Sequence, residues 1–71
     1  MFNKVTQNTP FFIVFSGAGY QSAPVGFEAI EQVRQAYRQA RCTGSFESQR
    51  VLRAHIVNNI TNQTIFKGRI K

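Results

Sequence analysis

The apolar residues of this chain first gather in an unbroken run, Phe-Phe-Ile-Val-Phe, at positions 11–15. Such a run predicts a strand that is apolar on both faces. Pro10 suits the first position of a strand, which places the expected strand at about 10–16. The Gly-Ala-Gly at 17–19 supplies two residues that adopt positive φ without strain, so the pattern predicts a tight β-hairpin turn after this strand.

The return strand of this hairpin is expected at 20–25, and two interpretations of the segment stay open. As a strand it is short, and Pro24 restricts it to the edge of a sheet. Alternatively, a helix begins at Ser22 with Pro24 in its first turn. We favour the strand, because Val25-Gly26 interrupts the helical pattern.

Helical periodicity is clearest over residues 27–41. With successive residues 100° apart, apolar side chains gather on one side and glutamines on the other. Glu28 and Glu31 fall in the first turn, where the helix dipole favours acidic groups, and Arg38 and Arg41 fall near the end, where it favours cations. The segment therefore predicts an amphipathic helix. Its apolar side comprises Phe27, Ala29, Ile30, Val33, Ala36, Tyr37 and Ala40.

Two further strands are expected after the helix. Thr43-Gly44-Ser45 ends the helix and forms part of a loop over 42–48. Residues 51–58 and 64–70 then alternate in character on either side of an Asn- and Thr-rich turn, which predicts a second hairpin. The expected order is β-β-α-β-β, an α+β fold with a mainly antiparallel sheet of about four strands and one helix packed on one face.

One helix with one apolar side covers only one face of such a sheet. The residues that alternation directs toward the helix are Leu52, Ala54, Ile56, Phe66 and Ile70. Those directed to the opposite face are Arg53, His55, Lys67 and Arg69, with Val51, Val57 and Ile65 among them. The first strand adds either Phe12 and Val14 or the alternate set Phe11, Ile13 and Phe15, and we take Phe12 and Val14 as candidates for partner binding.

The charge balance changes the expected use of this face. Nine lysines and arginines oppose three glutamates, and the formal net charge is +6. Such an excess favours an anionic partner, either nucleic acid or an acidic protein surface, over a membrane. The cations form two groups, namely those of the sheet face and Arg34, Arg38 and Arg41, which lie along one edge of the helix.

Three interpretations of the basic sheet face stay open. A protein partner or self-association as a homodimer is ranked first, because arginine and aromatic side chains anchor protein interfaces. A solvated face without a partner is ranked second. Nucleic acid is ranked third, since cations beside exposed aromatics neutralise phosphates and stack bases. For the helix arginines, a solvated edge is favoured over a binding site.

The sequence offers few residues for a disulfide, a metal site, catalysis or a phosphate-binding loop. Cys42 and His55 are the lone representatives of their types, so neither an internal disulfide nor a zinc site is expected, and the single thiol suits the cytoplasm. Glu28 and Glu31 are better explained by the helix dipole than by acid–base catalysis. Gly-Ala-Gly at 17–19 lacks the lysine of a Walker loop and the third glycine of a dinucleotide loop. We expect no enzyme and no cofactor.

The length of 71 residues predicts a single domain over 1–71 with a loose lead-in at 1–9. No apolar run approaches the length of a membrane span, and the N-terminus lacks the apolar segment of a signal peptide. The chain is therefore expected to be a small non-enzymatic binding protein.

The order of a short hairpin, one amphipathic helix and a second hairpin resembles very small phage-encoded proteins that disarm host machinery, among them type I anti-CRISPR inhibitors. The resemblance covers most of the chain in element order and size, and no motif or functional residue is transferred by it. It implies an inhibitor or regulator that contacts a nucleic-acid-handling protein complex of the host cell. Because a cationic face does not mimic DNA, such an inhibitor would touch acidic protein surface or retain nucleic acid. Direct, sequence-tolerant nucleic-acid binding is the alternative.

Overall fold

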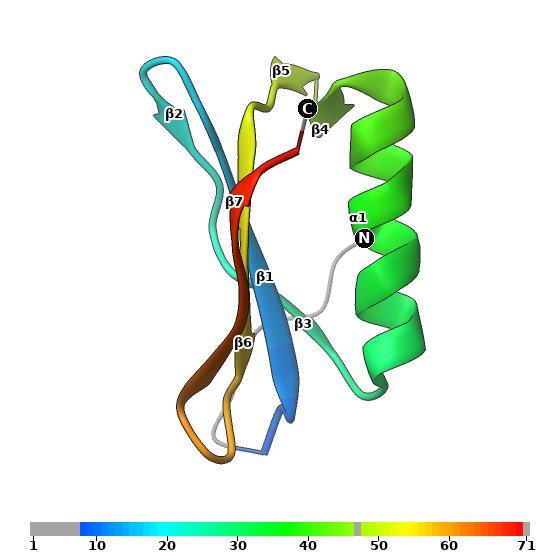
Figure 1. Ribbon diagram of the computed structural model, residues 1–71, viewed down its shortest axis with the longest axis vertical. Helices are drawn as coiled ribbons and strands as arrows, with labels where there is room; N and C mark the ends of the chain where they lie inside the picture. The colour runs from blue at the N-terminus through cyan, green and yellow to red at the C-terminus, as the bar shows by residue number, and fades with distance from the viewer. Residues whose placement is uncertain (1–7, 47, 71) are drawn as a thin grey trace.

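The computed structural model describes residues 8–46 and 48–70, and it contains one helix and a five-stranded antiparallel sheet (Figure 1). The predicted α+β class is confirmed. The long strands are β1 (Phe11–Gly17), β6 (Arg53–Asn58) and β7 (Gln63–Arg69), and the short ones are β2 (Tyr20–Gln21) and β3 (Val25–Phe27). The helix α1 spans Ile30–Thr43. Of the lead-in expected at 1–9, positions 1–7 lie outside the described residues.

Strand β1 lies in the interior of the sheet. Along the chain of pairings the order is β2-β1-β6-β7, and β3 also pairs with β1. Strands β2 and β3 follow one side of β1 at its two ends, through Ser16–Gln21 and Phe11–Phe27, while β6 follows the other side. The helix packs on one face of this sheet, and the other face is not covered by α1 (Figure 1).

The expected return strand at 20–25 is divided in two, and the alternative helix from Ser22 does not form. Ser22 bonds to Phe15 of β1 in both directions: its N–H donates to the Phe15 carbonyl at 2.7 Å, and its hydroxyl accepts the Phe15 N–H at 2.9 Å. Pro24, which has no N–H to donate, lies in the break between β2 and β3. At this point the backbone makes one of the two hydrogen bonds to β1, and the Ser22 side chain makes the other.

The helix begins three residues later than the periodicity suggested. Phe27 belongs to β3 and pairs with Phe11, so it is a strand residue and not the first residue of the helix. At the helix start, the Gln32 Oε1 accepts hydrogen bonds from the N–H groups of Glu28 and Ala29, at 3.1 and 3.3 Å. Because Ala29 has no side-chain acceptor, Gln32 supplies the cap from within the first turn.

The helix extends to Thr43, two residues beyond the predicted end at 41, and within the expected Thr43-Gly44-Ser45 stop it is capped by Gly44. This residue has φ 71°, in the left-handed region, and its N–H donates to the Ala40 carbonyl at 2.7 Å. The following loop is more ordered than expected, because β4 (Ser45–Phe46) and β5 (Gln49–Arg50) form a small separate hairpin. Phe46 from this hairpin lies over Phe15, with ring centroids 4.5 Å apart.

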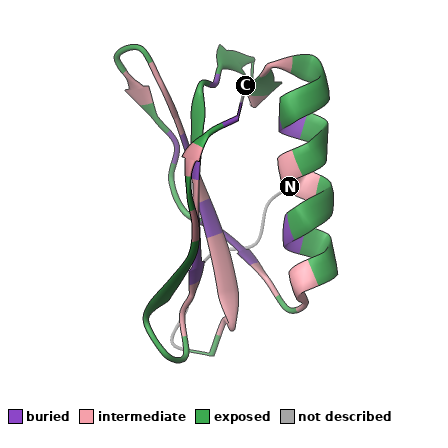
Figure 2. Ribbon diagram, viewed as in Figure 1, coloured by how far each residue is buried: buried purple, intermediate pink, exposed green. Residues whose placement is uncertain are grey.

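The core lies between α1 and the sheet. Ile13, Phe15 and Val33 are completely buried, which places one alternate set of β1 against the helix (Figure 2). Tyr37 of the helix meets Phe66 of β7 edge to face, with ring centroids 5.3 Å apart. The remaining buried members of this cluster are Val25, Ala40, Val51, Ala54, Ile56 and Ile70.

The prediction for positions 51 and 52 was wrong. Val51 is buried in the core, whereas Leu52, expected against the helix, is 43% exposed. The reason is that β6 begins at Arg53, so period-2 alternation does not extend back to these two residues. Val57, which was expected on the opposite face, is also buried, although it lies outside the core cluster.

Candidate functional site

The candidate site is the sheet face that α1 leaves uncovered, called here the open face. The register of β1, β6 and β7 arranges its side chains in three rows that cross the strands. The rows are Phe12–Val57–Thr64, Val14–His55–Lys67 and Ser16–Arg53–Arg69. Successive row members are two residues, or about 6.5 Å, apart on β1 and β6, whereas on β7 the register shift places Thr64 and Lys67 three residues apart.

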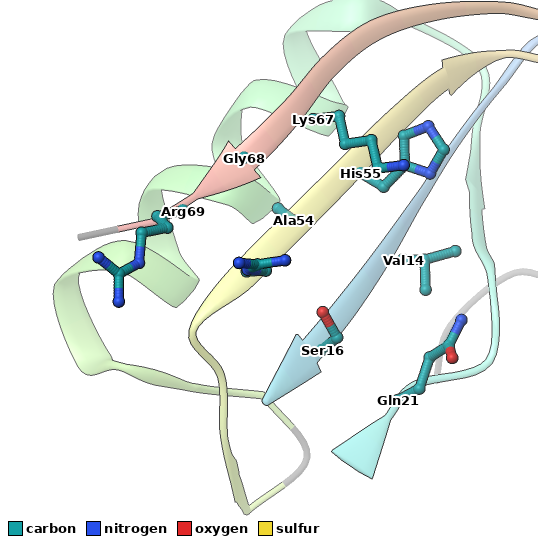
Figure 3. Close-up of a pocket in the computed structure, with 9 residues that line it drawn as sticks. Val14, Ser16, Gln21, Ala54, His55, Lys67, Gly68 and Arg69 are labelled. Carbon is teal, nitrogen blue, oxygen red and sulfur yellow. The ribbon is translucent and has the colours of Figure 1, made fainter. Parts of the chain in front are cut away.

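Two of these rows line a pocket of about 560 Å³ (Figure 3). Of the residues predicted for partner binding, the pocket brings together Val14, Arg53, His55, Lys67 and Arg69. Phe12 is not among its lining residues. It lies in the remaining row, Phe12–Val57–Thr64, beside the β6–β7 turn. The pocket is completed by Ser16, Gln21, Ala54 and Gly68.

Two arginines oppose each other directly in this pocket, and a lysine lies opposite the histidine. Arg53 on β6 pairs in register with Arg69 on β7, and His55 pairs with Lys67. Like charges at directly opposed positions of a sheet destabilise the fold. The lining residues include no aspartate or glutamate, and the two described glutamates, Glu28 and Glu31, lie at the start of α1. Within the described part of the chain, the site therefore concentrates positive charge that no acidic residue compensates.

His55 is held in place by a neighbouring side chain. Its Nε2 and the Thr64 Oγ1 share a hydrogen bond of 3.1 Å. The imidazole is half-buried between Val14 on one side and Lys67 on the other. The ring is thus oriented within the pocket, where it presents an aromatic surface and a second hydrogen-bonding nitrogen.

Two polar lining residues, Ser16 and Gln21, were missed by the sequence analysis. Ser16 continues the alternation of Val14 along β1, so the expected strand already held the signal for it. Gln21 faces the pocket because it pairs with Ser16 across the hairpin. Its position depends on the register of a two-residue strand, which the sequence pattern does not specify.

The apolar part of the open face is smaller than predicted. Phe12 and Val14 are both only half-exposed, and Val57 beside Phe12 is buried. A large apolar side chain, Ile65, is 47% exposed where the register shifts from Ile56–Phe66 to Val57–Thr64. Ile65 is the extra residue of this β-bulge.

The helix arginines form a separate basic surface. Arg34, Arg38 and Arg41 are all exposed on α1, and none of them lines the pocket of the open face. The structure therefore does not bring the two predicted cationic groups together.

The remaining candidate chemistry concerns metal ligands and the single cysteine in the described part of the chain. No group of three or more His, Cys, Asp or Glu residues is placed to hold a metal ion there. Cys42 is exposed on α1, while His55 lies on the sheet. At fourteen residues, with a polar outer side, α1 is too short and too polar to span a membrane.

Comparison of the chain with protein-family models, with curated proteins and with solved structures gives no match.

Proposed function

We propose that this protein is a non-enzymatic binding protein that holds a strand of nucleic acid on the open face of its sheet. The observation that carries this proposal is the concentration of uncompensated cations on this face, where Arg53 lies directly opposite Arg69 and Lys67 lies two residues before Arg69 on β7. A like-charge pair such as Arg53–Arg69 reduces the stability of the sheet, and bound phosphate groups would relieve the repulsion. The wall of the pocket offers cations, hydrogen-bonding groups and an imidazole, the side-chain types that bind sugar-phosphate and bases.

A protein target is the second candidate. The exposed side chains of Leu52 and Ile65 add apolar area near the cations, a combination that also suits an acidic protein surface. In this case the protein would be an inhibitor or regulator that contacts a nucleic-acid-handling complex of the host cell, as the anti-CRISPR-like layout suggests. The limited exposure of Phe12 and Val14 favours nucleic acid over this candidate, because it leaves less apolar area to anchor a protein.

The two candidates are separated by titrating the purified protein with fluorescent DNA and RNA at two salt concentrations. Binding should weaken steeply as salt rises, since each neutralised phosphate releases counterions. Replacing Lys67 and Arg69 with glutamine should weaken binding at both salt concentrations and reduce its salt dependence.

The matched control carries Arg34→Gln and Arg41→Gln, which lower the net charge equally on the helix edge. This variant should bind like the parent protein. Loss of binding in the control alone would assign the site to the helix, and no binding by the parent protein at either salt concentration would favour a protein target.

A further inference from the structure

The open face is divided lengthwise by the chemistry of its side chains. The cations come from β6 and β7, as Arg53, Lys67 and Arg69 show, whereas β1 and β2 contribute the uncharged Ser16 and Gln21. Figure 3 shows Ser16 and Gln21 on one side of the pocket and Lys67 and Arg69 on the other. An occupant with one charged edge and one uncharged, hydrogen-bonding edge would match both sides.

We infer that the pocket holds single-stranded nucleic acid, with its phosphates along β6 and β7 and its bases directed toward β1 and β2. This inference rests on the proposed function and assigns a role to each side of the pocket. Lys67 and Arg69 contact phosphate, and Ser16 and Gln21 contact base edges.

The spacing of the cations fits a sugar-phosphate backbone that runs parallel to the strands. Lys67 and Arg69 are two residues apart on β7, a separation of about 6.5 Å, and Arg53 and His55 repeat this step on β6. The step is comparable to the separation of successive phosphates in an extended strand. Two rows of cations therefore suit two neighbouring phosphates, one at each row.

The uncharged side has the groups that base recognition requires. The Gln21 amide carries both a donor and an acceptor, and the Ser16 hydroxyl is able to act as either. A base edge exposed in a single strand pairs with such groups, whereas in a duplex the Watson–Crick edges are already paired. The single strand is therefore favoured over the duplex.

The test measures the affinities of the protein for short oligodeoxythymidylate, oligodeoxyadenylate and oligodeoxycytidylate by fluorescence anisotropy. Gln21→Ala should change the affinity ratio between two of these homopolymers by about fivefold or more, with the salt dependence unchanged. Lys67→Gln should do the reverse, keeping the ratios and lowering the slope of log affinity against log salt by about 0.7.

Two controls keep this result specific. Gln35→Ala removes an exposed amide from α1 and should change neither the ratios nor the slope. Thermal melting of each variant verifies that it remains folded, and Ser16→Ala provides a second probe of the uncharged side.

The assignment of the two sides is wrong if Gln21→Ala and Ser16→Ala leave all ratios unchanged, or weaken every homopolymer equally. The inference is also wrong if a DNA duplex binds as tightly as the best of these single strands. These outcomes leave the proposed function standing, because they still require nucleic-acid binding. Failure of the proposed function has a different signature, namely no binding of any of these nucleic acids by the parent protein.

Discussion

At the scale of single residues, Val33 provides the most direct test of how the helix packs. Its side chain is completely buried against the sheet, so Val33→Ala leaves a cavity and should lower the free energy of unfolding by about 2 kcal/mol. Gln35, on the exposed side of the same helix, is the matched position, and Gln35→Ala should change this free energy by less than about 0.5 kcal/mol. Chemical denaturation measures both, and equal losses would contradict the orientation of α1.

Ser22 is a second residue whose side chain has a definable structural role. Because its hydroxyl accepts the Phe15 N–H in a buried position, Ser22→Ala leaves that donor without its acceptor and should cost about 1–3 kcal/mol. Hydrogen exchange at the Phe15 amide should accelerate more than at neighbouring amides of β1. Ser45→Ala, at an exposed position, serves as the control. Unchanged exchange at Phe15 would show that this bond does not protect the strand.

At the scale of elements, Gly17 is required by the close approach of two backbone segments. A Cβ at Gly17 would collide with the carbonyl oxygen of Arg50, and a backbone atom cannot move aside as the end of a side chain does. We therefore expect Gly17→Ala to lower the free energy of unfolding by more than about 1 kcal/mol.

Gly68 in β7 is the comparison, since a Cβ there would make an ordinary contact of 3.6 Å with the Phe66 ring. Gly68→Ala should change stability by less than about 0.5 kcal/mol, or raise it, because alanine restricts the unfolded chain. A thermal melt of the two variants measures the difference. A larger loss at Gly68 than at Gly17 would contradict this account.

The helix and the strands also show which parts of the fold the sequence alone predicts. Period-2 alternation correctly predicted that Phe66 faces the helix while Lys67 is exposed, and Thr43-Gly44-Ser45 correctly marked the segment in which α1 ends, although the helix runs two residues past the predicted 41. Phe27 was misassigned because an aromatic residue next to a helix suits the last position of a strand as well as the first turn. Val51 and Leu52 were misassigned because alternation has no meaning before the strand begins.

The sequence predicted which basic residues share the candidate site, but it did not predict which of them lie opposite each other across the strands. Alternation alone gave Arg53, His55, Lys67 and Arg69 a common face. That Arg53 opposes Arg69 depends on the bulge at Ile65, which shifts the register of β7 by one residue. A sequence pattern does not locate such an insertion, since its energy depends on the partner strand.

At the scale of the whole molecule, stability and binding should respond to charge in opposite directions. The double change Lys67→Gln and Arg69→Gln removes from an exposed surface the charge that opposes Arg53 and a second cation two residues away. The melting temperature at low salt should therefore stay constant or rise slightly, and the difference should shrink as salt screens the repulsion. Differential scanning calorimetry at two salt concentrations measures this, and unfolding of the variant would mean that these side chains support the core.

The same charge distribution bears on self-association. If two copies met through their open faces, the cations of Arg53, Lys67 and Arg69 would face those of the partner copy and repel them. We expect a monomer at low salt in sedimentation equilibrium, with no dimer promoted by the open face. Stronger association of the parent protein than of the Lys67→Gln, Arg69→Gln variant would instead support the homodimer.

The pairing of β1 with β6 has a consequence for how this chain is made. In the folded sheet, Ile13 of β1 lies beside Ile56 of β6. Strand β1 is synthesised before the helix and the small hairpin, and its partner β6 is synthesised only after them. Contacts between residues that are so far apart in the sequence form slowly and late. Until β6 leaves the ribosome, the nascent chain exposes the apolar run at 11–15, a segment well suited to chaperones and prone to aggregation. Ribosomes that stop short of the last hairpin would release a product that cannot bury this segment.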